Sequence, residues 1–221
     1  MKSFKLFLFD LDGTLIDSDQ MIIETFRELY SIYRPGFYPS DDYIRQFSGP
    51  QMVDTLKKEF PNYDLKMMME EYKKHSKQYY DKTVCLFPYV KEMLEILKDN
   101  DIHFGVITNK FRFATDYSYK LLKIDHLDIY SVCADDVKEY KPAADGIIKA
   151  MQHFNVQNKD EVIYIGDNDT DYITAKNAGV KFGYTAWSPR HLTKGNNPDV
   201  LIKNFKEFTE EIVAWKRPTL L

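Results

Sequence analysis

Short apolar runs that alternate with helical stretches constrain the fold of this chain more than any other feature. Residues 5–9, 103–108 and 162–166 each have the length and composition of a buried strand, and polar residues stop each run. Between the later runs, apolar residues recur at helical spacing. This alternation predicts an α/β fold: a doubly wound, Rossmann-like parallel sheet with helices on both faces.

The stretch from about 17 to 85 differs, because it contains helix and turn patterns but no strand pattern. Helices are expected there at 18–33, 41–47 (with Ser40 as N-cap), 52–60 and 65–80. In the remainder, further short strands are expected at 130–133, 182–186 and 200–202, and helices at 90–97, 114–122, 143–154, 170–178 and 204–215. We therefore predict a core domain of residues 1–16 and 86–221 and an inserted helical domain of residues 17–85.

Charge and composition exclude several classes of function. The 221 residues carry a formal net charge of −4 with no basic stripe, which argues against a nucleic-acid partner. No apolar window reaches the length of a membrane span, and the N-terminal apolar run, interrupted by Asp10, is too short for a signal peptide, so a cytoplasmic protein is expected. Cys85 and Cys133 form no CxxC pair, which excludes a zinc or disulfide framework, and both are expected to be buried as small hydrophobes.

Polar side chains follow four of the predicted strands. In chain order these are Asp10 and Asp12; Thr108, Asn109 and Lys110; Asp135, Asp136 and Lys141; and Asp167, Asn168, Asp169 and Asp171. Ligands of open parallel sheets bind beyond the carboxyl ends of the strands, so these residues are expected to converge on one cleft.

Such a cluster suits the transfer of a phosphoryl group. Carboxylates without His or Cys favour a hard cation such as Mg²⁺, and Thr108, Asn109 and Lys141 can donate hydrogen bonds to a phosphate. Gly13 permits an unusual turn after Asp10 and Asp12, which can direct both carboxylates at one cavity. One of them can attack phosphorus to form an aspartyl-phosphate, while the other protonates the leaving oxygen and later deprotonates water.

These residues resemble the motifs of the haloacid-dehalogenase-like (HAD) hydrolase superfamily over about residues 4–187. The matching stretches are Asp10-Leu11-Asp12-Gly13-Thr14-Leu15, Ile107-Thr108-Asn109, Lys141-Pro142 and Gly166-Asp167-Asn168-Asp169-Thr170-Asp171, continued by Ala175-Lys176-Asn177-Ala178-Gly179.

The resemblance implies a role for each motif residue. Asp10 is expected to be the nucleophile and a Mg²⁺ ligand, and Asp12 the general acid/base that also binds the metal through its backbone carbonyl. Thr108 and Lys141 are expected to hold the phosphoryl group with Asn109 as a helper. Asp167 is expected to ligate Mg²⁺, supported by Asp171 and Gly13.

The helical insertion resembles the small cap of the phosphoglycolate phosphatase and beta-phosphoglucomutase branch. The chain departs from that pattern at Tyr89, Tyr140 and Ala144, which bears on the substrate more than on the reaction. Asp12 argues against dehalogenation, since dehalogenase members lack the second carboxylate. In the insertion, Ser48, Gly49 and Pro50 are candidates for a substrate-facing loop.

The leading interpretation is a Mg²⁺-dependent phosphatase acting on a small phosphorylated metabolite, such as phosphoglycolate, a sugar phosphate, a nucleotide or pyrophosphate. The alternatives are a sugar phosphomutase on the same scaffold and a non-catalytic phosphate-binding module. A monomer without a membrane partner is expected. Taken one at a time, some of these residues also have a purely structural explanation. Asp10 and Asp12 can form a turn at the end of a strand, Thr108 can cap the N-terminus of a helix, and Asp169 can be a charge in the first turn of a helix.

Overall fold

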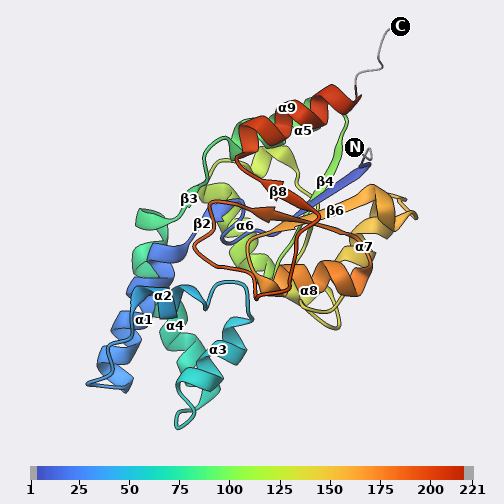
Figure 1. The fold of residues 1–221 in the computed structure, drawn as a ribbon. Helices are drawn as coiled ribbons and strands as arrows, with labels where there is room; N and C mark the ends of the chain where they lie inside the picture. Colours follow the sequence, from blue (N-terminus) through green and yellow to red (C-terminus); the bar gives the residue numbers. More distant parts are fainter. Residues whose placement is uncertain (1–3, 217–221) are drawn as a thin grey trace, which may run out of the picture.

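The protein is described by a computed structural model over residues 4–216, and its centre is a parallel sheet (Figure 1). The sheet has six strands in the order β5-β4-β1-β6-β7-β8. The bounds are Leu6–Phe9 for β1, His103–Ile107 for β4, Ser131–Val132 for β5, Val162–Gly166 for β6, Lys181–Thr185 for β7 and Val200–Ile202 for β8. Strand β1 lies between β4 and β6, with Phe9 opposite Val106 and Ile165. The predicted strands are confirmed, with small shifts at their ends.

Helices cover both faces of the sheet, which confirms the doubly wound fold. Alternate residues of β1 point to opposite faces: Phe7 and Phe9 pack edge-on against Phe208 and Phe205, whereas Leu6 and Leu8 belong to the other core cluster. The first face carries α5 (Val90–Asp99), α6 (Arg112–Leu121) and α9 (Phe205–Lys216), and the second carries α7 (Asp145–His153) and α8 (Asp169–Ala178). Short 3₁₀ turns occur at Asp125–Leu127, Ala134–Asp136 and Lys159–Glu161.

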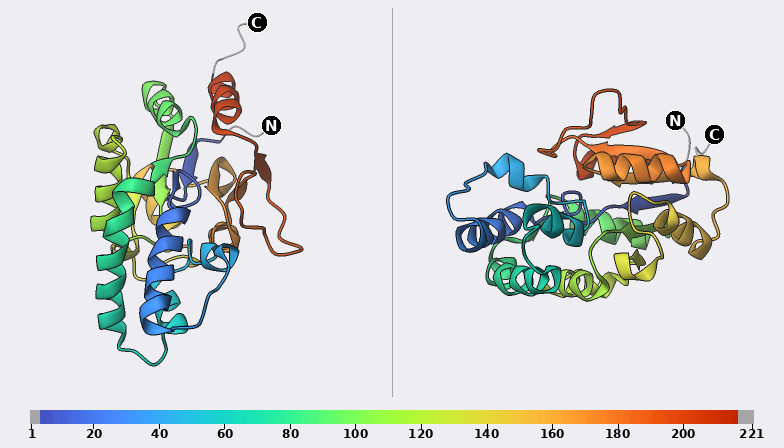
Figure 2. Two further views of the ribbon diagram at one scale, coloured as in Figure 1. Left: turned by 90° about the vertical axis from the view of Figure 1, so that its left-hand side faces the viewer. Right: turned by 90° about the horizontal axis from the view of Figure 1, so that it is seen from below.

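Four helices lie between residues 18 and 84. They are α1 (Asp19–Tyr33), α2 (Asp41–Arg45), α3 (Met52–Glu59) and α4 (Leu65–Thr83). Figure 2 shows α1 and α4 running side by side. Buried aromatic rings, among them Phe26, Tyr30 and Phe60, fill the space between the helices. The Ser40 hydroxyl accepts a hydrogen bond from the Tyr43 N–H, as its expected capping role requires.

A two-stranded antiparallel sheet joins the two ends of this helical segment. The sequence patterns did not predict it. Its strands are β2 (Ile16–Asp17) and β3 (Cys85–Leu86), with Ile16 paired to Leu86 and Asp17 to Cys85. Neither of these two-residue segments shows a strand pattern in the sequence. The pairing joins the two points at which the chain enters and leaves the helical segment.

The prediction that both cysteines are buried is wrong for Cys85 and correct for Cys133. The reason is the alternation of side chains along an extended strand: Val84 takes the buried position, so Cys85 is turned outward. None of the helices within residues 4–216 combines the length and apolar character needed to cross a membrane.

Candidate active site

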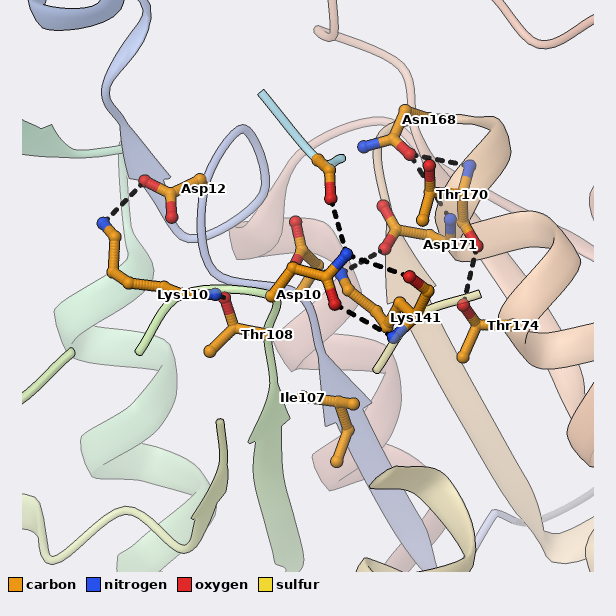
Figure 3. A network of polar contacts seen from close by, with 12 residues as sticks. Asp10, Asp12, Ile107, Thr108, Lys110, Lys141, Asn168, Thr170, Asp171 and Thr174 are labelled. Carbon is orange, nitrogen blue, oxygen red and sulfur yellow. Dashed lines mark hydrogen bonds and ion pairs between the residues drawn. The ribbon is translucent and has the colours of Figure 1, made fainter. Parts of the chain in front are cut away.

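Residues from all four motifs meet beyond the carboxyl ends of β1, β4 and β6 (Figure 3). The ammonium of Lys141 lies 2.6 Å from Asp10 Oδ1 and 2.7 Å from Asp171 Oδ1. It also donates to the Tyr164 hydroxyl, 2.9 Å away, which in turn lies 2.9 Å from Asp171 Oδ1. All four side chains are buried. The sequence reasoning did not select Tyr164, although a tyrosine inside the apolar run 162–166 was a visible signal.

Asp10 combines a fixed oxygen with a free one. Oδ1 accepts from Lys141, whereas Oδ2 is buried and has no hydrogen-bond partner. Burial raises the pKa of Asp10 well above its ordinary value, the charge of Asp171 adds to the rise, and Lys141 opposes it. A buried carboxylate oxygen without a partner is unfavourable unless a ligand meets it, so Oδ2 marks a place for a cation or a phosphoryl group.

Asp12 faces a different set of partners. Its Oδ1 accepts hydrogen bonds from the Ser18 hydroxyl at 2.7 Å and the Lys110 ammonium at 2.9 Å. Lys110 also donates to the hydroxyl of Tyr80 in α4, at 3.0 Å. Burial acts to lower the pKa of Lys110, but Asp12 and Tyr80 together, through charge and hydrogen bonds, outweigh it, so the pKa is raised and the side chain stays charged. Lys110 therefore connects Asp12 to the helical segment, a role that its position after β4 did not reveal.

Asp167 lies at the second end of the cluster and is almost enclosed by donors. Its Oδ2 accepts from Arg190 Nη1 at 2.7 Å and from the Ser188 hydroxyl at 3.1 Å, and its Oδ1 accepts from the Asn168 amide at 2.8 Å. Burial raises the pKa of Asp167 to about 6, helped by the charge of Asp171 and opposed by Arg190.

Arg190 is the largest contribution to the site that sequence reasoning missed. Besides Asp167, it pairs through Nη2 with Asp19, the first residue of α1, and donates from Nε to the Arg45 carbonyl at 3.0 Å. The side chain is 2% exposed. One guanidinium thus ties the carboxylate cluster to both α1 and α2 of the helical segment.

Three carboxylates have the spacing of a metal site. Asp10, Asp167 and Asp171 each offer an oxygen, and these oxygens lie within 4.8 Å of one another. All-oxygen donors suit a hard divalent cation, and the partnerless Asp10 Oδ2 fits such an ion. Both oxygens of Asp171 accept from the protein, Oδ2 from the Asp167 N–H and Oδ1 from Lys141, and both oxygens of Asp167 accept as well. The three carboxylates together therefore form a donor set that fits Mg²⁺.

Thr108 and Asn109 form hydrogen bonds with the backbone of neighbouring site residues. The Thr108 hydroxyl accepts from the Lys110 N–H at 3.1 Å. The Asn109 amide donates to the Lys141 carbonyl at 3.1 Å and accepts from the Lys141 N–H at 2.9 Å, so it holds the backbone of the central lysine. It also donates to the Gly49 carbonyl at 2.9 Å, which places the loop at 48–50 beside the site. Contact of Thr108 and Asn109 with phosphate stays a prediction.

The turn at Gly13 requires glycine for two reasons. Its φ is +88°, in the left-handed region, and a Cβ built there would lie 2.4 Å from Asp167 Oδ2. The first and fourth motifs can therefore lie this close together only because residue 13 has no side chain.

Other acids that follow the strands do not join the cluster. Asp135 and Asp136 bind the backbone N–H groups of Arg112 and Cys133, respectively. Asp169 accepts from the Thr193 N–H at 3.0 Å and the Asn196 amide at 2.8 Å, so it organises the loop after β7.

A cavity of about 500 Å³ lies between the helical segment and the core. Asp10, Asp12 and Thr108 contribute to its wall from the core, and the loop at 48–51 and helix α4 contribute from the helical segment. The partnerless oxygen of Asp10 therefore belongs to a carboxylate that borders a space of ligand size.

Comparisons with known proteins match this geometry. Residues 7–184 match the family described as haloacid dehalogenase-like hydrolase. The pyrophosphatase PpaX of Halalkalibacterium halodurans is 31% identical over 205 residues, which cover 92% of this chain and 94% of that protein. A haloacid dehalogenase-like hydrolase from Bacteroides fragilis is 26% identical, with a TM-score of 0.80 over 93% of this chain and 99% of that chain. A predicted phosphoglycolate phosphatase from Haemophilus somnus, 23% identical, shares the fold with a TM-score of 0.78 over 96% of this chain and 99% of that chain.

Proposed function

The chain belongs to the haloacid dehalogenase-like hydrolase family, and on that premise we propose that this phosphatase hydrolyses a small-molecule phosphate monoester through an aspartyl-phosphate on Asp10. One observation carries the proposal. The Asp10 carboxylate is held by Lys141 through Oδ1, and its buried Oδ2 has no partner while the residue borders the cavity. Such an oxygen is fixed in position and free to react, as a nucleophile must be.

In the first step, Asp10 Oδ2 forms a bond to phosphorus while the bond from phosphorus to the leaving oxygen breaks. Asp12, which also borders the cavity, gives its proton to the leaving oxygen. In the second step, water attacks phosphorus, Asp12 takes the proton of that water, and the bond between phosphorus and Asp10 breaks. Ser18 and Lys110 position Asp12 for both transfers.

Charge repulsion is the main obstacle to an attack by a carboxylate on a phosphate. Lys141 supplies a fixed positive charge 2.6 Å from Asp10, and burial strengthens its effect. Mg²⁺ bound to Asp10 and Asp167 would neutralise the transferring group and orient it. Asp171 holds Lys141 in place, and Thr108 is the further donor that we assign to the phosphoryl oxygens.

We assign residues 17–85 to a cap and the rest of the chain to the catalytic core. The antiparallel pairing of β2 and β3 supports this boundary, because it joins the two connections between the parts. The cap contributes Gly49, Tyr80 and Asp19 to contacts with the core site. Closure of the cap excludes water while the leaving group is present.

The substrate class that these features support is a small phosphorylated metabolite. The similarity to a pyrophosphatase makes pyrophosphate one candidate and favours hydrolysis over return of the phosphoryl group to a sugar, as a mutase would do. Cytoplasmic location and a monomeric state stay predictions.

Phosphate release from a generic aryl phosphate tests the proposal, with Mg²⁺ and after removal of divalent cations by chelation. We expect Asp10→Asn to abolish turnover and chelation to suppress it. The matched control is Asp99→Asn, the same change at an exposed position outside the cavity, which should keep the wild-type rate. Equal rates for wild type and the Asp10 variant would refute the proposed nucleophile.

A further inference from the structure

The cavity has a second region that the reaction steps leave unused. Besides the carboxylates, its wall contains aromatic side chains that include Phe111, Phe113 and Tyr117 from the core, and Lys73 and Lys77 from α4. The aromatic residues belong to α6 and the turn before it, so this region lies on both sides of the boundary between cap and core.

The aromatic side chains are unusually open to solvent for their size. Phe113 is 60% exposed and Tyr117 is 44% exposed. The Phe111 and Phe113 rings are nearly parallel, at 15°, with centroids 6.3 Å apart. Exposed rings are common on protein surfaces, but rings that line one cavity form a surface on which a flat apolar group can pack.

Lys73 and Lys77 add positive charge to this aromatic surface. They are one helical turn apart and therefore on the same face of α4, where like charges repel. Neither forms an ion pair with any residue in the described range 4–216. The Lys73 ammonium lies 5.4 Å from the centroid of the Phe113 ring. An anion bound between the two ammonium groups would remove their repulsion.

The size and polarity of the cavity argue against inorganic pyrophosphate as its best occupant. Pyrophosphate consists of two phosphoryl groups and has no apolar surface to place against Phe113 and Tyr117. A cavity of about 500 Å³ has the volume of sites that take organic ligands.

We propose that the leaving group of the substrate is an aromatic alcohol that carries a second anionic group. Its ring packs on Phe113 and Tyr117, and its anion binds Lys73 and Lys77. This inference rests on the proposed function only in placing the phosphoryl group at Asp10, and it names the substrate class: anionic aryl or arylmethyl phosphate monoesters.

Binding of non-hydrolysable phosphonates tests the proposal without requiring turnover. The probes are ethylphosphonate, naphthylmethylphosphonate, the same arene with a carboxylate, and methylenediphosphonate as the pyrophosphate analogue. Calorimetry on the full chain with Mg²⁺ measures Kd for each. We expect the arene to bind about tenfold more tightly than the ethyl compound and the carboxylate to add about another fivefold.

Variants separate the two contributions. Phe113→Ala should reduce the advantage of both arenes, and Phe113→Leu should restore part of it. Lys73→Gln with Lys77→Gln should remove only the gain from the carboxylate. Lys66→Gln, an exposed change on the same helix outside the cavity, should leave all four constants unchanged.

The inference is overturned if ethylphosphonate or methylenediphosphonate binds as tightly as the carboxylated arene, or if the lysine variants weaken all probes equally. Failure of the proposed function gives a different result: Asp10→Asn would turn over substrate at the wild-type rate while the preference among phosphonates could still be measured.

Discussion

Replacing Gly13 by alanine should destabilise the protein and weaken its metal site, and the structure separates two causes. The backbone at Gly13 has a φ of +88°, which an L-residue with a side chain adopts only under strain. The added methyl would also lie 2.4 Å from Oδ2 and 2.7 Å from Cγ of Asp167, and 3.0 Å from Nη1 of Arg190. Both neighbours are buried and paired with each other, so they have little room to move.

The magnitude follows from adding the two effects. The left-handed conformation costs a non-glycine residue about 1–2 kcal/mol. Forcing an extra carbon into a packed site costs about 1–3 kcal/mol. The free energy of unfolding should therefore fall by roughly 2–5 kcal/mol.

Gly36 is the matched control. Its φ is +91°, but a Cβ there would meet nothing within 4 Å. Gly36→Ala should show only the conformational part, about 1–2 kcal/mol. Urea unfolding of both variants, with the Kd for Mg²⁺ from calorimetry, measures the difference. Equal losses of stability, or unchanged Mg²⁺ binding in the Gly13 variant, would refute the reasoning from the close approach of the two motifs.

Three further predictions concern the charges of the site. Lys141→Met removes the countercharge of two buried carboxylates, so unfolding in urea at pH 8 should show a loss of about 3–5 kcal/mol. The pKa of Asp167, raised to about 6, means that folding favours its protonated form. Without metal, its contribution to stability is therefore present below pH 4 and is lost as pH rises through 6, whereas Mg²⁺ affinity should increase over the same range; calorimetry at pH 5 and 7.5 checks this. Arg190→Gln removes a cation 2.7 Å from Asp167 Oδ2 and should tighten Mg²⁺ binding about tenfold in the same assay.

Each of these predictions has an opposing outcome. Lys138→Met, at an exposed position in the same segment, should change stability by less than about 0.5 kcal/mol, and an equal effect at Lys141 would contradict its assigned role. A Mg²⁺ affinity that is flat between pH 5 and 7.5 would argue that Asp167 is not a ligand. Weaker Mg²⁺ binding after the change at Arg190 would indicate that this side chain positions Asp167 rather than competing for it.

Strands and helices of this protein were largely predictable because each is encoded by a local pattern. The run 162–166 is a strand with the expected bounds, and α1 lies within one residue of its predicted start. Failures occurred where no local pattern exists. The strands β2 and β3 have two residues each, and their pairing joins positions about 70 apart in sequence, so only the folded chain creates them. The outward position of Cys85 follows from that pairing.

Within the site, the predictable residues were those that directly follow a strand. Asp10, Thr108 and Asp167 could be selected because parallel strands bring their carboxyl ends to one edge. Arg190 and Ser188 lie in a loop without strand or helix periodicity. A buried arginine in such a loop cannot be distinguished from an exposed one by sequence pattern alone, because its burial depends on partners far away in the chain.

The sequence by itself determined the α/β fold and the candidate site residues that follow its strands, since a carboxylate after a strand and a glycine after a carboxylate are local features. Only the tertiary structure decided the pKa shifts of these side chains and the partners that fix their positions. Lys141 reaches Asp10 across 131 positions and Arg190 reaches Asp19 across 171. Electrostatic interactions depend on distance and burial in space, and neither quantity exists until the chain has folded.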